Sequence, residues 1–87
     1  MPTVREIIED KLAARFSPQS LSVVDESHLH AGHVGARPEG ETHFRVTIVA
    51  DEFGGKSRVE RHRLVNETLK EELAGPVHAL AVKADGP

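Results

Sequence analysis

The segment HFRVTIVAD, residues 43–51, constrains the fold more than any other part of the sequence. Phe44, Val46 and Ile48 alternate with the residues between them, and this period of two is typical of a strand with one buried face. A helical segment and another short apolar segment follow it. Because a strand, a helix and a strand in this order form a crossover connection, the last strand is predicted to run parallel to the strand at 43–51.

A first helix is predicted to begin at Val4. Thr3 and Glu6 form a capping-box pattern, in which the two side chains satisfy amides at the start of a helix. Apolar residues recur every four positions along this helix and form one stripe: Val4, Ile8, Leu12 and Phe16. Pro18 ends the helix, because the residue before a proline avoids the helical conformation. Residues 21–25, LSVVD, are rich in β-branched side chains and predict a strand.

A second helix is predicted from Ser57 to Gly75-Pro76. Ser57 and Glu60 repeat the capping-box pattern, and a glycine followed by a proline is a typical helix stop. VHALAV, residues 77–82, predicts the last strand.

These elements follow one another in the order α-β-β-α-β. They predict an α+β fold with a three-stranded mixed sheet and helices on one face, and a chain of 87 residues has room for a single domain, 1–87. The sequence has no cysteine, which excludes disulfides, thiol nucleophiles and thiolate metal ligands within this chain. No set of residues suggests catalysis, so we expect a protein that is not an enzyme.

Charge and hydropathy narrow the expected partners and location. The formal net charge of −3 disfavours general affinity for nucleic acid, because binding to phosphates favours basic proteins, although a local basic patch can still bind. No apolar run is long enough to cross a bilayer. The N-terminus lacks the basic head and long apolar run of a secretory signal, so we expect a cytoplasmic protein that does not bind membranes.

Histidines are the candidate metal ligands of this chain. Three of the six lie in HLHAGH, within the long loop predicted at residues 27–42: His28, His30 and His33. Imidazole is a common metal ligand, but this spacing alone fits a solvated polar loop as well as a metal site. His78 in the last strand fits either a histidine held by a backbone group at the edge of the core or a fixed ligand that completes a site with a loop histidine.

Basic residues surround the start of the second helix. The cluster consists of Lys56, Arg58, Arg61, His62 and Arg63. The positive end of a helix dipole favours anions there, so the cluster fits a surface for nucleic acid or another partner, or a merely solvated helix end. On the helical period, His62 shares a stripe with Val65 and Leu69. We therefore expect His62 to be half-buried and to support Arg61 and Arg63, which contact the partner.

Four segments, in this order, resemble the BolA family over nearly the whole chain: VVDESHLH (23–30), ETHFRVTIV (41–49), Phe53 and Gly55 followed by RHR (61–63), and GPVHAL (75–80). The resemblance implies an α-β-β-α-β fold similar to the class II KH domain. KH domains hold nucleic acid with a G-x-x-G loop between helices. Gly32 and Gly35 have this spacing, but they lie between the predicted strands and are not that loop.

The resemblance also implies a function. BolA proteins are partners of monothiol glutaredoxins, with which they share a [2Fe-2S] cluster in iron-sulfur trafficking or iron regulation. Glutaredoxin and glutathione supply thiolates, and BolA supplies the histidine of the last strand and a His or Cys of the loop. By position these ligands are His78 and His30, with His33 and His28 as alternatives, and the isolated protein is expected to be a monomer without cofactor. The family also includes bacterial stress-response transcriptional regulators, in which the RHR helix is taken to bind DNA.

Overall fold

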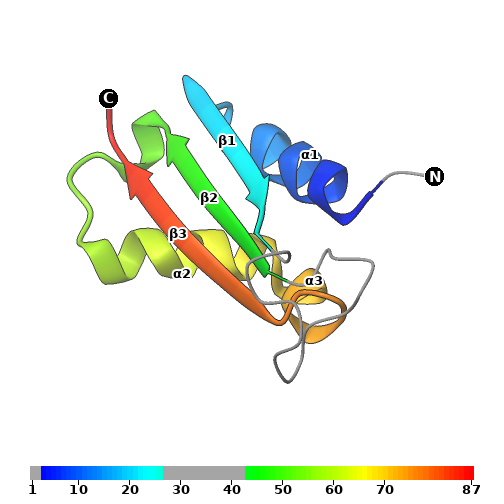
Figure 1. Ribbon diagram of the computed structural model, residues 1–87. Coiled ribbons are helices and arrows are strands. Elements are labelled where there is room, and N and C mark those ends of the chain that lie inside the picture. Colours follow the sequence, from blue (N-terminus) through cyan, green and yellow to red (C-terminus); the bar gives the residue numbers. More distant parts are fainter. Residues whose placement is uncertain (1–2, 27–42) are drawn as a thin grey trace.

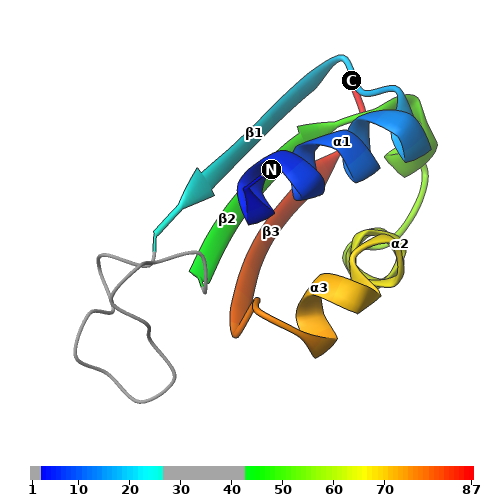
Figure 2. The same cartoon turned by 90° about the vertical axis from the view of Figure 1, so that its right-hand side faces the viewer.

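The computed structural model describes residues 3–26 and 43–87. Its elements, in chain order, are α1 (Val4–Phe16), β1 (Ser20–Asp25), β2 (His43–Val49), the 3-10 helix η2 (Asp51–Phe53), α2 (Arg58–Thr68), α3 (Lys70–Ala74) and β3 (Ala79–Asp85). The strands form one sheet in the order β1-β2-β3, in which β2 is antiparallel to β1 and parallel to β3. The helices lie together on one face of the sheet (Figures 1 and 2). The predicted α+β fold with a mixed sheet is confirmed.

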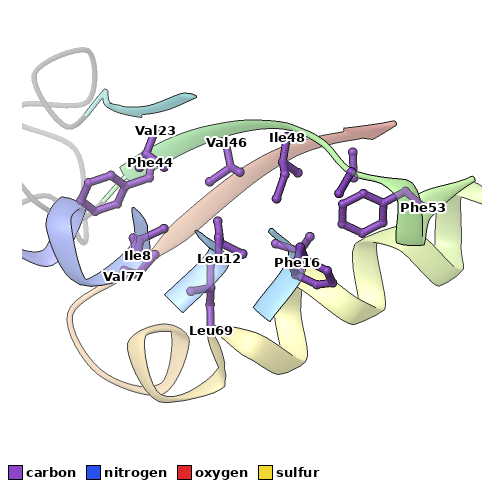
Figure 3. Packing of buried hydrophobic residues seen from close by; sticks show 13 residues of the cluster. Ile8, Leu12, Phe16, Val23, Phe44, Val46, Ile48, Phe53, Leu69 and Val77 are labelled. Atoms are coloured by element: carbon purple, nitrogen blue, oxygen red, sulfur yellow. The ribbon is translucent and has the colours of Figure 1, made fainter. Parts of the chain in front are cut away.

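The core lies between this face of the sheet and the helices. Phe44, Val46 and Ile48 are 2%, 0% and 0% exposed, so the alternation read from β2 correctly identified its buried face. They pack in one cluster with the stripe of α1 (Figure 3), in which Ile8 and Leu12 are fully buried. Burial of one such side chain contributes about 1.5–3 kcal/mol, which makes this interface the main source of stability.

The start and end of α1 follow from its sequence. The Thr3 hydroxyl accepts a hydrogen bond from the Glu6 amide at 3.1 Å, as the capping pattern predicts. Ser17 adopts the left-handed conformation at φ 45°, and its amide donates to the Ala13 carbonyl at 3.0 Å. This closes the helix immediately before Pro18.

Two ion pairs attach the exposed side of α1 to neighbouring segments. Lys11 donates to both carboxylate oxygens of Glu72 at 3.0 and 2.8 Å, which joins α1 to α3. Arg15 makes bidentate hydrogen bonds of 2.7 and 2.8 Å to Glu52, which joins α1 to η2. These hydrogen bonds are the main reason that the pKa of Glu52 lies below its usual value.

The second helix is interrupted at Leu69, where the sequence predicts one continuous helix from Ser57 to Gly75. Leu69 has φ −105° and ψ 19°, and Figure 2 shows α3 turned away from the axis of α2. The Thr68 hydroxyl donates to the Leu64 carbonyl at 2.8 Å, a type of bond that bends helices. Leu69 is only 1% exposed and belongs to the core cluster. The expectation of one straight helix is therefore wrong at this residue.

The last strand begins and ends later than the predicted 77–82. Val77 is buried, and its amide donates to the Glu72 carbonyl at 2.9 Å, so this group closes α3 instead of joining the sheet. β3 starts at Ala79, opposite His43, and continues to Asp85, opposite Val49. His78, predicted within the strand, therefore lies one residue before its start.

The strands β1 and β2 differ from their predicted ranges by one or two residues. β1 starts at Ser20, one residue earlier than predicted, and β2 ends at Val49 instead of residue 51. Asp51, predicted as the end of this strand, instead begins the 3-10 helix η2. Among the helices of the described residues, none is long and apolar enough to cross a membrane.

Candidate functional site

His78 lies on the surface, in the connection between α3 and β3. Its side chain is exposed, and the chain on either side of it is fixed by the bond that closes α3 and by the pairing of Ala79 with His43. Its ring faces that of His43, with the ring centroids 5.5 Å apart and the planes tilted by 52°. An imidazole that is accessible yet in contact with a second imidazole can present a nitrogen to another molecule.

His43 is the first residue of β2 and is only 8% exposed. Its carbonyl accepts a hydrogen bond of 2.7 Å from the Glu26 amide, at the end of β1. The sequence pattern does not mark His43 as part of a site. The pairing of the strands is the signal that places it there. In the parallel pair of β2 and β3, the first residue of β2, His43, lies beside the first residue of β3, Ala79, which follows His78 in the chain.

A shallow hollow of about 270 Å³ lies beside this histidine pair, with His43, Glu26, Arg45 and Ala79 in its lining. Among residues 3–26 and 43–87, no three His, Asp or Glu side chains lie close enough together to hold a metal ion. The predicted loop ligands His28, His30 and His33 lie outside the described residues. The described part of the chain thus brings together two imidazoles, and any third ligand must come from the segment 27–42 or from another molecule.

A second, larger hollow of about 550 Å³ lies between the start of α2 and β3. Four cations line it together with one imidazole and one carboxylate: Arg45, Arg58, Arg61, Lys83, His62 and Asp85. The chain as a whole has a formal net charge of −3, so this local cluster of cations differs in sign from the net charge of the protein. Anions that reach this hollow meet a favourable potential.

Arg61 is engaged with its own chain. Its Nε donates to the Lys56 carbonyl at 3.0 Å, and its NH1 donates to the Ala84 carbonyl at 2.9 Å and to Asp85 at 3.1 Å. These bonds attach the first turn of α2 to the end of β3. The sequence predicted a partner contact for Arg61, and the structure gives this side chain a part in holding the fold.

The other basic residues differ in how accessible they are. Lys56 donates to the Glu52 carbonyl at 2.7 Å, and His62 is half-buried, as the helical stripe predicts. Arg58 and Arg63 are exposed and have no ion-pair partner among the described residues. Of the predicted basic cluster, Arg58, Arg61 and His62 line the hollow, and Lys56 and Arg63 do not.

Two cations of the basic hollow come from the sheet and were not predicted. Arg45 lies on β2 and pairs with Glu26 at 3.0 Å, and Lys83 is exposed on β3 without a carboxylate partner in the described part of the chain. Both occupy the face of the sheet opposite the helices, because they alternate with core residues. The hollow combines these sheet residues with residues at the start of α2, beside the edge strand β3, an arrangement that the sequence pattern does not reveal.

Comparison with known proteins places the chain in a family. Residues 12–87 match the family model described as BolA-like protein. The mouse BolA-like protein 1 is 50% identical over 84 residues, which are 97% of this chain and 58% of the mouse protein. The Escherichia coli protein named DNA-binding transcriptional regulator BolA is 48% identical over 79 residues, which are 91% of this chain and 71% of that protein.

Solved structures agree with this assignment. The BolA domain of SufE1 from Arabidopsis thaliana superposes with a TM-score of 0.89 at 42% identity, covering 100% of this chain and 95% of that domain. The chain belongs to the BolA-like family, and the resemblance seen in the sequence is confirmed.

Proposed function

We propose that this BolA-like protein is a non-enzymatic binding module that pairs with a monothiol glutaredoxin and shares a [2Fe-2S] cluster with it. In this proposal, His78 is one ligand from this chain and a histidine of the segment 27–42 is the other: His30, or alternatively His33 or His28. The glutaredoxin and its glutathione supply the thiolates that a cysteine-free chain lacks. The free protein then carries no cofactor.

The exposure and fixed position of His78 support the proposal best. A ligand to a shared cluster has to reach the surface of its own protein, and His78 does so at the edge of the sheet. Imidazole also suits the chemistry, since in some [2Fe-2S] centres two histidines replace two cysteines on one iron.

The chain's own part in such a site is to position donors. The short connection 75–78 is held at one end by the Val77 amide and at the other by the first pair of the β2–β3 ladder. The backbone that carries this imidazole therefore loses little freedom when the imidazole binds iron. The cluster supplies the redox and transfer chemistry, and this protein supplies orientation and one side of the binding surface.

Mixing the protein with a cluster-loaded monothiol glutaredoxin tests the pairing. We expect a one-to-one complex by size-exclusion chromatography and a change in the visible circular dichroism of the cluster. Glutaredoxin without the cluster is the control that separates cluster-dependent pairing from simple adhesion. If the loaded glutaredoxin elutes unchanged with an unaltered spectrum, the proposed pairing is wrong.

The basic hollow supports a second candidate function, DNA binding by a transcriptional regulator. Arg58 and Lys83 are exposed, unpaired within the described residues, and line one hollow with Arg45 and Arg61. Side chains of this kind contact phosphates and thereby position a protein on DNA. The Escherichia coli relative carries DNA binding in its name.

A salt series tests this second function. Each lost phosphate contact lowers the slope of log K against log salt by about 1, so Arg58→Ala with Lys83→Ala should reduce the slope by about 2. Lys70→Ala is the matched control, because Lys70 is an exposed cation on α3 outside the hollow. Equal slopes for the wild type and the double variant would mean that Arg58 and Lys83 do not contact DNA phosphates.

A further inference from the structure

We infer that His43 is the positioning residue of the metal-ligand histidine: its buried ring holds the imidazole of His78 in the orientation in which it ligates a shared metal centre. This inference rests on the proposed function, because it concerns how His78 is presented to the cluster. It adds a residue that neither the sequence pattern nor the resemblance assigned to the site.

The contacts of His78 carry the inference. Within residues 3–26 and 43–87, its side chain makes no hydrogen bond or ion pair, and the ring of His43 is the aromatic group that it contacts. An exposed histidine without a polar partner ordinarily samples several staggered rotamers. A ring 5.5 Å away and tilted by 52° restricts that choice on one side.

His43 is itself well anchored. It is 8% exposed, it begins β2, and its backbone is bound on both sides, to Glu26 of β1 and in register with Ala79 of β3. A side chain on a central strand is placed more accurately than one on a connection. His43 can therefore transfer the rigidity of the sheet to a ligand that lies just outside it.

The arrangement matches a general feature of metal sites. Ligating histidines are usually oriented by a neighbouring group, and loss of that group typically lowers metal affinity about 10-fold to 100-fold. Most such neighbours act by hydrogen bonds. Here the interaction between the two histidines is a contact between their rings. A flat ring at position 43 should therefore suffice to orient His78, whatever the other interactions of His43 contribute.

The free protein provides the first test, which needs no glutaredoxin. Three-bond couplings measured by NMR report the rotamer population of His78, and a nuclear Overhauser effect between the two rings reports their contact. We expect one dominant rotamer in the wild type and in His43→Phe, and averaging in His43→Ala. Averaged couplings and no ring contact in the wild type would overturn the inference without reference to any variant, so a variant that fails to fold does not hide the answer.

The second test uses the complex with cluster-loaded monothiol glutaredoxin. We expect His43→Ala to lower the affinity for the loaded glutaredoxin about 10-fold and to shift the cluster's circular dichroism toward that of His78→Ala. His43→Phe should restore both. Loss in both variants would make His43 a ligand in its own right, and no change in either would make it irrelevant to the site, so either result overturns the positioning role.

The two tests separate the failure of this inference from the failure of the proposed function. If His78→Ala leaves the cluster spectrum unchanged, the proposed ligand role is wrong, while the NMR measurement still decides whether His43 orients His78. If His78→Ala alters the spectrum but His43→Ala does not, the ligand role of His78 is supported and the positioning role of His43 is wrong.

Discussion

Replacement of Arg61 by alanine should destabilise the fold, although the residue lies in a surface basic cluster. Its guanidinium donates to Ala84, Asp85 and Lys56, and its side chain is 27% exposed. A hydrogen bond that involves a charged group contributes about 1.5–3 kcal/mol when well shielded. Because these bonds are partly exposed and not additive, we expect a total loss of about 2 kcal/mol in the free energy of unfolding.

Arg63→Ala is the matched control, since Arg63 lies two residues further along α2, is exposed, and has no partner among the described residues. A surface substitution of this kind changes stability by about 0.5 kcal/mol or less. With a urea m-value of about 1 kcal/mol/M, Arg61→Ala should lower the unfolding midpoint by about 2 M and Arg63→Ala by about 0.5 M or less. Equal midpoints for the two variants would refute the structural role of Arg61.

Two further predictions concern the core and the dependence on pH. Leu12→Ala removes most of a fully buried side chain of α1. It should lower the free energy of unfolding, measured by urea denaturation, by about 3 kcal/mol. A loss below about 1 kcal/mol would mean that α1 packs more loosely than described. The pKa of Glu52 is lowered, chiefly by hydrogen bonds from Arg15, so its contribution to stability is complete above the ordinary glutamate pKa of about 4.3 and is lost as the pH falls through the lowered value. Acid unfolding curves should therefore show the wild type more stable than Glu52→Gln at neutral pH and the difference vanishing in acid, and a constant difference across that range would contradict this.

The architecture was predictable because it is encoded in local patterns. The alternation of Phe44, Val46 and Ile48 depends on the geometry of one strand, and the Ser57 cap depends on bonds within four residues, including the Glu60 amide to the Ser57 hydroxyl at 3.2 Å. A helix between two strands then requires the parallel pairing of β2 and β3. Each of these steps uses information that lies close together in the sequence.

The errors arose where a distant or competing bond decides the conformation. The sequence does not show that the Thr68 hydroxyl will bind the Leu64 carbonyl and bend the helix, or that the Val77 amide will close α3 instead of joining the sheet. As a result, His78 lies exposed on the connection one residue before β3.

The candidate site was predictable in part. His78 was singled out from its place in the sequence, but its neighbour His43 lies 35 positions earlier and becomes part of the site only through the register of β2 with β3. The same reason applies to Lys83 and Arg45 at the basic hollow. Arg61 shows the reverse: its residue type and position suggest a partner contact, and only the structure reveals its bonds to Ala84 and Asp85.

The central claim is that His78 ligates a cluster shared with a monothiol glutaredoxin. The most direct test is the visible circular dichroism of the mixed complex, measured for the wild type, His78→Ala and His62→Ala. His62 is a half-buried histidine on α2, in the lining of the basic hollow, and serves as the matched control. Of these two variants, we expect only His78→Ala to change the spectrum of the cluster. An identical spectrum for His78→Ala and the wild type would contradict the ligand role of His78.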